Sequence, residues 1–215
     1  MTLRAALQAH LHGELEDPAI ALALADIVLQ DTLSWRAPVI AVDRITTIIG
    51  FTFGNRILPN GNREPGPVNE ALAEVVAELH QKTGARVIAQ WEVAAALQGR
   101  VAHDVGTPIN PGRDSRGEPV YLGTSGVLEE IARQAAPQSL GCVGVAAFAD
   151  HICRCVATAR RLRFDAYAPE DFTMPGAYDP QSGQAWCRDR QAYLLHDIMI
   201  RVTERRADVV GSSWG

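Results

Sequence analysis

Short apolar runs alternate with helical patterns along most of the chain. The runs are rich in β-branched and small apolar residues, which is typical of buried strands. They are Arg44 to Phe53, Arg86 to Gln90, Cys142 to Ala147 and Phe164 to Tyr167. Helices are expected at Pro67 to Lys82, Trp91 to Leu97, Thr124 to Ala135, after Asp150 and His151, and at Arg188 to Arg205. This order predicts a Rossmann-like three-layer α/β/α fold with a mainly parallel sheet.

The first part of the chain reads as two helices. Residues Thr2 to Leu33 carry a helical pattern that we expect to break near Gly13. Asp17 and Pro18 are expected as the N-cap and first-turn proline of the second helix. Its apolar stripe should pack on the sheet or on a partner. The stripe consists of Ile20, Leu24, Ile27 and Val28.

Three segments lack a hydrophobic period and predict irregular structure. Residues 54–67 are rich in glycine, proline and asparagine and indicate a long loop. Residues 99–121 are polar, and a loop of that length inside a domain is usually a lid or binding loop. Residues 169–186 form another irregular stretch, and the tail after Asp208 is expected to fray.

The length and charge restrict the class of protein. A chain of 215 residues suits a single domain, with an N-terminal helical extension at 1–43 and an α/β core at 44–206. With 20 basic and 25 acidic residues, a net charge of −5 argues against a nucleic-acid partner. No apolar run has membrane-spanning length, so we expect a cytoplasmic protein with a small-molecule ligand and no membrane partner. A homodimer through the N-terminal helices is one expected arrangement.

Neither the cysteines nor the glycine-rich segments form a recognised motif. The four cysteines lack disulfide-framework spacing and are expected as free thiols. On a helix, His151, Cys153 and Cys155 point in different directions, so no metal is expected. The chain contains no phosphate-loop pattern, no dinucleotide-binding glycine pattern and no serine nucleophile elbow.

Polar residues follow the ends of several predicted strands. In a parallel sheet the carboxyl ends of the strands share one edge, where ligands usually bind. We therefore expect a site at this edge. The candidate ligand-binding residues are Gly54, Asn55, Arg56, Asn69, Trp91, Glu92, Thr124, Ser125 and Asp150, and the candidate catalytic residues are His151 and Arg154.

His151 and Arg154 are three residues apart and should share a face of the first helical turn. The helix N-terminus favours an anion and a neutral imidazole. Our hypothesis is that Arg154 holds a carboxylate or phosphate while His151 acts as a base or donor. The alternative is that Asp150 caps the helix, His151 lies on the surface and Arg154 pairs with an acidic neighbour.

Two further positions allow both a ligand-binding and a structural interpretation. Glu92 can bind ribose hydroxyls and Trp91 can stack on a base, or they can be a first-turn anion and a core residue. Thr124 and Ser125 can donate to an anion at their helix start or simply cap that helix, and capping is the favoured interpretation.

The order of these pieces resembles the YdcF-like family, the group that includes SanA and ElyC and is built on a domain of unknown function. The resemblance extends over roughly Thr46 to Arg205. It is carried by Gly66, Pro67 and Asn69 at a helix start, by Thr124, and above all by His151 and Arg154. The chain differs where the family has an arginine near Asn69, a small-residue turn at 90–92 and a glutamate at Asp197.

The family resemblance implies a Rossmann-like fold, a ligand site at the carboxyl edge and, for one branch, binding of S-adenosylmethionine. Three functions follow as alternatives. The first is a small-molecule enzyme or binding protein for S-adenosylmethionine or another nucleoside-containing ligand, with group transfer as its chemistry. The second is a hydrolase or transferase that acts on a phosphate-bearing envelope precursor. The third is a non-catalytic regulatory or scaffold protein.

Overall fold

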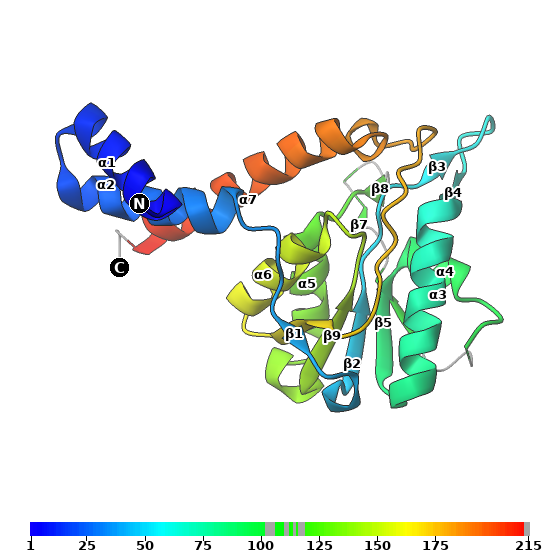
Figure 1. Ribbon diagram of the computed structural model, residues 1–215. Coiled ribbons are helices and arrows are strands. Elements are labelled where there is room, and N and C mark those ends of the chain that lie inside the picture. The colour runs from blue at the N-terminus through cyan, green and yellow to red at the C-terminus, as the bar shows by residue number, and fades with distance from the viewer. Residues whose placement is uncertain (102–105, 110–111, 114, 116–118, 213–215) are drawn as a thin grey trace. The chain divides into compact units, whose positions relative to one another are not determined.

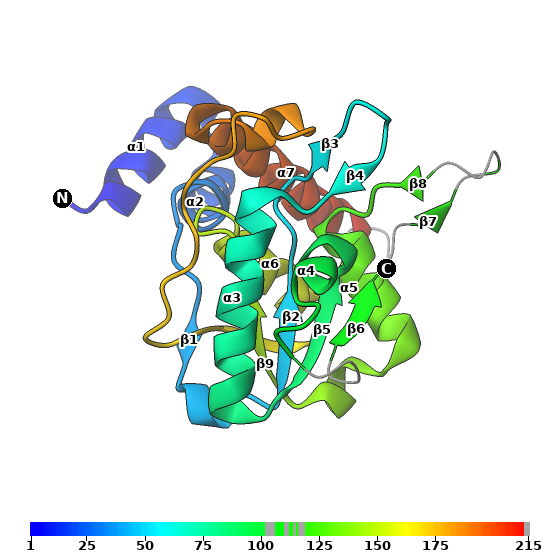
Figure 2. The ribbon, with the colours of Figure 1, turned by 90° about the vertical axis from the view of Figure 1, so that its right-hand side faces the viewer.

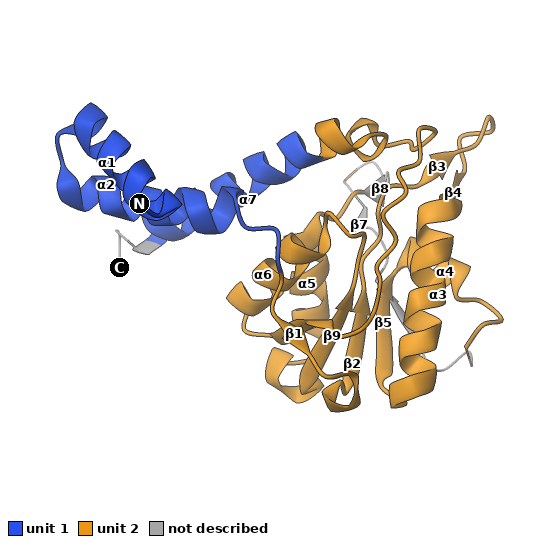
Figure 3. Cartoon of the chain, viewed as in Figure 1, with its two compact units in different colours: residues 1–36, 194–215 blue, residues 37–193 orange. Residues whose placement is uncertain are grey.

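The chain divides into two compact units. The computed structural model describes residues 1–215 apart from 102–105, 110–111, 114, 116–118 and 213–215. One unit contains residues 37–193, and the other contains residues 1–36 and 194–215 (Figure 3). The first of these includes most of the expected α/β core, whereas the second part of the last helix groups with the N-terminal helices.

A parallel sheet forms the centre of unit 37–193, as predicted, and it has six strands. Its strands run in the order β1-β10-β9-β2-β5-β6, and every neighbouring pair is parallel. They are β1 (Val39–Ile40), β2 (Thr47–Gly50), β5 (Arg86–Gln90), β6 (Gly106–Ile109), β9 (Cys142–Ala146) and β10 (Asp165–Pro169). The two edge strands, β1 and β6, were not predicted, and β2 is shorter than expected.

Helices cover both faces of the sheet, which gives the three-layer Rossmann-like architecture (Figures 1 and 2). On one face Ile48 packs in a cluster with Leu72 and Val76 of α3 (Gly66–Thr83), and α4 (Trp91–Ala96) adds Val93. On the other face Ile49 packs with residues of α5 (Thr124–Gln134) and α6 (Ile152–Arg161). Strands buried on both faces read as continuous apolar runs, which is why β5 and β9 were recognisable. Short 3-10 turns lie at Val42–Arg44, Pro137–Leu140 and Ala185–Cys187.

Two of the segments expected to be irregular contain regular structure. Residues 54–67 include the antiparallel hairpin of β3 (Arg56–Ile57) and β4 (Arg63–Glu64). Residues 99–121 include β6 and the hairpin of β7 (Gly112–Arg113) and β8 (Pro119–Val120), while other parts of that segment lie outside the described residues. The expectation of structureless loops was therefore wrong for these pairs. Backbone pairing with a partner strand, rather than side-chain burial, defines them.

The second unit contains α1 (Leu3–Leu15), α2 (Pro18–Ile27), a π-helical turn (Val28–Thr32) and most of α7 (Arg190–Ser212). Asp17 caps α2 as predicted. The predicted break at Gly13 was wrong, because α1 ends at the left-handed residue Glu16. The tail beyond Asp208, expected to fray, remains helical to Ser212.

Two residues of the predicted apolar stripe of α2 are exposed within the chain, so the expected packing of this stripe on a partner stays a prediction. Ile20 and Leu24 are 50% and 37% exposed, whereas Ala21 and Ala25 are fully buried. The sequence of α2 is apolar at almost every position, so the spacing of its apolar residues does not identify which face is buried. The small alanine side chains permit close packing, and their face is the buried one. No helix among the described residues is long and apolar enough to cross a membrane.

Candidate functional site

The expected site residues follow three neighbouring strands. The central strands β9, β2 and β5 end at Ala146, Gly50 and Gln90. Because the three strands are parallel, the segments that follow them emerge at the same edge of the sheet. The prediction that these strand ends share one edge of the sheet is therefore confirmed. Which of the candidate side chains contact one another is shown by the hydrogen bonds described next.

Asn55 and Glu92 form a buried pair at the ends of β2 and β5. The two residues are 3% and 1% exposed, and Asn55 Nδ2 donates a hydrogen bond of 3.2 Å to Glu92 Oε1. The remaining oxygens, Asn55 Oδ1 and Glu92 Oε2, have no hydrogen-bond partner among the described residues. Burial raises the pKa of Glu92, because removing a carboxylate from water disfavours its charged form.

Thr124, His151 and Arg154 meet at the starts of α5 and α6. Arg154 Nη1 donates to Thr124 Oγ1 at 2.8 Å, and His151 Nε2 lies 3.5 Å from the same oxygen. Arg154 Nη2 also donates to the Tyr193 hydroxyl at 3.4 Å. Thr124, His151 and Arg154 are each at most 7% exposed, so the surface position considered for His151 is wrong.

The helix starts differ from those expected. Gly123 is the N-cap of α5, which lacks a side-chain capping bond. The favoured interpretation of Thr124 or Ser125 as the cap is therefore wrong, and the Thr124 hydroxyl contacts Arg154 instead. His151 occupies the N-cap position of α6, likewise without a side-chain capping bond. Hence both helix N-termini direct backbone N–H groups toward the carboxyl edge of the sheet without a carboxylate cap.

Tyr121, which lies shortly before α5, was missed from the sequence. Although 46% of this residue is exposed, its hydroxyl is withdrawn from water, and this desolvation raises the pKa to about 12. Gln184 hydrogen-bonds to the hydroxyl, and the charges of Glu92 and Arg154 act on it in opposite directions. The only sequence signal was a tyrosine at the end of a long polar segment, directly before a helix.

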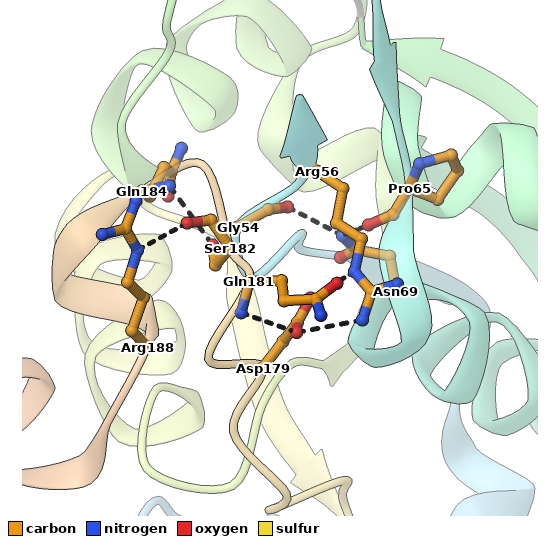
Figure 4. A network of polar contacts seen from close by, with 9 residues as sticks. All are labelled: Gly54, Arg56, Pro65, Asn69, Asp179, Gln181, Ser182, Gln184 and Arg188. Carbon is orange, nitrogen blue, oxygen red and sulfur yellow. Dashed lines mark hydrogen bonds and ion pairs between the residues drawn. The ribbon is translucent and has the colours of Figure 1, made fainter. Parts of the chain in front are cut away.

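A segment from Tyr178 to Arg188 crosses the loop that follows β2, and we call it the cover segment (Figure 4). Gly183 N donates to Asn55 O at 2.7 Å, and Arg188 Nε donates to Ser182 O at 2.7 Å. At Gly54, which has φ of 70°, any side chain would collide with the Ser182 hydroxyl. Gly54 therefore permits this close approach, which is a structural role that the sequence did not predict.

Arg56 anchors the cover segment through a bidentate ion pair with Asp179. Its Nε and Nη2 donate to the two carboxylate oxygens of Asp179 at 2.9 and 3.1 Å (Figure 4). The Arg56 guanidinium holds the pKa of Asp179 below its usual range, and Gln181 N donates to the same carboxylate at 3.0 Å. Arg56, predicted to bind ligand, is occupied by this pair.

Asn69 organises the loop between β2 and the cover segment. It is fully buried, and its Oδ1 accepts bonds from Thr52 Oγ1 and Phe53 N at 2.7 and 2.9 Å. Its Nδ2 donates to Gly54 O and Pro65 O at 2.7 and 2.6 Å (Figure 4). With all the polar atoms of its side chain engaged, Asn69 positions the backbone, which is a structural role that the sequence did not predict.

The other predicted residues lie around this site. Trp91 and Ser125 are half-buried in the first turns of α4 and α5. Asp150 accepts hydrogen bonds from the Tyr178 hydroxyl at 2.8 Å and from Arg190 at 2.9 and 3.1 Å. Asp150 thus fixes the cover segment and the start of α7, and it does not cap α6.

The cysteines are reduced thiols. Cys187, in the cover segment, is 3% exposed, and burial raises its pKa to about 12. Its Sγ donates to Gln184 Oε1 at 3.4 Å. Within the described part of the chain, no group of three or more metal-ligating side chains is present.

Comparison with known proteins gave no relative. No family model, no curated protein and no solved structure matches the chain.

Proposed function

We propose that the chain is a YdcF-like small-molecule enzyme or ligand-binding protein that holds a nucleoside-containing ligand with a carboxylate or phosphate group at the carboxyl edge of its sheet. S-adenosylmethionine is the first candidate ligand, and group transfer is the candidate chemistry. One observation carries the proposal: buried Arg154 and His151 both meet the Thr124 hydroxyl at the edge of the sheet where Asn55 and Glu92 form a second buried polar pair. Functional sites concentrate buried ionisable groups of this kind.

The anionic end of the ligand is assigned to Arg154 and the two helix starts. Arg154 is only 6% exposed, and its guanidinium donates hydrogen bonds to the hydroxyls of Thr124 and Tyr193. A hydroxyl is a neutral acceptor that a ligand oxygen can replace or supplement. The uncapped N-termini of α5 and α6 add N–H donors to the same region.

The donor set fits the chemical groups of S-adenosylmethionine. Its carboxylate suits Arg154, and its ribose hydroxyls suit acceptors such as Glu92. Bound S-adenosylmethionine would supply an activated methyl group. The protein would bind and orient it, and His151, beside Thr124 Oγ1, would accept the proton of the group that receives the methyl.

The same features leave a second candidate, a hydrolase or transferase acting on a phosphate ester. Two helix N-termini beside a buried arginine favour a phosphate as much as a carboxylate. The two candidates differ in whether the nucleoside contributes to affinity.

Calorimetric titration of the full chain with S-adenosylmethionine tests the proposal. We expect saturable binding, and at least tenfold weaker binding by Arg154→Met, because a lost hydrogen bond to a charged group costs about 1.5–3 kcal/mol. Arg133→Met is the matched control, because the Arg133 side chain is 72% exposed and pairs with Glu130.

Thr124→Val is a second test variant, which serves if Arg154→Met fails to fold. It replaces the buried hydroxyl by a methyl group of similar size and should weaken binding in the same direction. If the wild-type chain binds inorganic phosphate but not S-adenosylmethionine, the phosphate-ester candidate replaces the first. If it binds neither at millimolar concentration, the non-catalytic scaffold replaces both.

A further inference from the structure

The pair of Asn55 and Glu92 leaves two adjacent hydrogen-bond acceptors unused. The bond from Asn55 Nδ2 to Glu92 Oε1 holds the amide and the carboxyl group in contact. Asn55 Oδ1 and Glu92 Oε2 belong to these same two groups, and both lack a partner among the described residues. Buried polar atoms are nearly always hydrogen-bonded, so two unused acceptors in one contacting pair call for a specific explanation.

The chemistry of the two atoms restricts what would satisfy them. Neighbouring acceptors are complemented by a group that offers two donors, such as a vicinal diol or an ammonium. An ammonium suits only an ionised carboxylate. A hydroxyl both donates and accepts, so it suits Glu92 whether or not the carboxyl carries a proton, and burial favours the protonated form here.

We infer that Asn55 and Glu92 form a subsite for the vicinal hydroxyls of a ligand, such as those of a ribose. This inference rests on the proposed function, since it assigns the neutral, hydroxyl-bearing part of the ligand to Asn55 and Glu92 and the anionic group to Arg154. It adds Asn55 as a direct ligand contact. The backbone of Asn55 is held by Gly183 of the cover segment, which positions the amide independently of the ligand.

A matched pair of uncharged probes tests the subsite without the anion. Adenosine carries the vicinal diol, and 2′,3′-dideoxyadenosine lacks it. Binding of each to the full chain is followed by ligand-observed NMR titration at up to millimolar concentration. We expect adenosine to bind at least tenfold more tightly than the dideoxy compound, because a site built around hydroxyls discriminates strongly against an analogue without them.

Substitutions then locate the discrimination. Glu92→Met keeps nearly the size of the side chain but removes both oxygens, and it should reduce the preference for adenosine at least tenfold. Asn55→Ser, which removes Oδ1, should do the same and serves if Glu92→Met fails to fold. The control is Glu78→Met, at a position whose carboxylate is 54% exposed and pairs with Lys82.

The outcomes separate this inference from the proposed function. Equal affinity for the two probes overturns the inference, as does failure of the wild-type chain to bind adenosine, or an unchanged preference in both variants. If Arg154→Met leaves S-adenosylmethionine binding intact while the preference for adenosine persists, the assignment of the anion fails and the diol subsite stands.

Discussion

Replacing Asn69 by aspartate should destabilise the protein strongly although the side chain keeps its size. Asn69 Oδ1 accepts two bonds that a carboxylate can still accept, from Thr52 Oγ1 and Phe53 N. Nδ2, in contrast, donates to the carbonyls of Gly54 and Pro65 at 2.7 and 2.6 Å. Aspartate would place an oxygen against both carbonyls.

The magnitude follows from those two bonds. Each buried acceptor that loses its donor costs about 1–3 kcal/mol, so the loss of two donors in Asn69→Asp should lower the free energy of unfolding by about 2–6 kcal/mol. A total stability of about 5–15 kcal/mol makes this a large fraction. The new carboxyl group, buried beside two carbonyl oxygens, should have a native pKa above its unfolded value of about 3.9. Its destabilising effect should therefore be smaller at pH 5 than at pH 8, because the protonated acid can donate to one carbonyl.

Urea denaturation at both pH values measures the effect. Asn62→Asp makes the same chemical change at an exposed loop position and serves as the control. A variant Asn69→Asp within about 0.5 kcal/mol of the wild type at pH 8 would refute the assignment of Asn69 as an organiser of the loop after β2.

Three further predictions concern Glu92, Asp179 and Cys187. Because the pKa of Glu92 is raised in the folded state, the contribution of this residue to stability is present below the unfolded pKa and is lost as the pH rises through the folded pKa. In urea titrations, Glu92→Gln should therefore gain stability relative to the wild type between pH 4 and pH 8. A stability difference that stays constant over this range would contradict the prediction. Asp179→Asn removes the ion pair with Arg56 and should speed amide hydrogen exchange of Gly183 about tenfold, which corresponds to about 1.4 kcal/mol of local stability. Unchanged exchange would show that the ion pair does not hold the cover segment. Cys187, with its pKa raised to about 12 by burial, should resist iodoacetamide at pH 8 and react in urea, as mass spectrometry of the peptide will show; rapid alkylation of the native protein would contradict its burial.

The sequence predicted the central sheet because its strands are buried on both faces. β5 was placed at its observed bounds, since its apolar run is flanked by glycine on one side and a helical pattern on the other. β6 was missed because Gly106–Ile109 contains a proline and lies in a polar segment. A proline is tolerated there because β6 is the edge strand of the sheet.

The site was predictable at the level of topology but not of contacts. Asn55 and Glu92 each follow a strand, and the edge argument placed both correctly. That their side chains pair depends on the order β2-β5 in the sheet, which periodicity does not reveal. The role of Tyr121 and that of the cover segment depend on irregular backbone, where no hydrophobic period exists to guide a prediction.

The position of β2 in the sheet has a consequence for how the protein folds. β2 pairs with β5 across a short connection through α3, but its other neighbour, β9, lies almost a hundred residues away, with Thr47 opposite Val143. Closing the longer loop costs more chain entropy, so the β2-α3-β5 unit should form first and β9 should join it late. Pulse-labelled hydrogen exchange during refolding can test this order: amides of β5 should gain protection before those of β10, and the reverse order would refute it. During synthesis, the nascent chain would then expose one edge of β2 until β9 has emerged, and this interval is the period of greatest risk for mispairing.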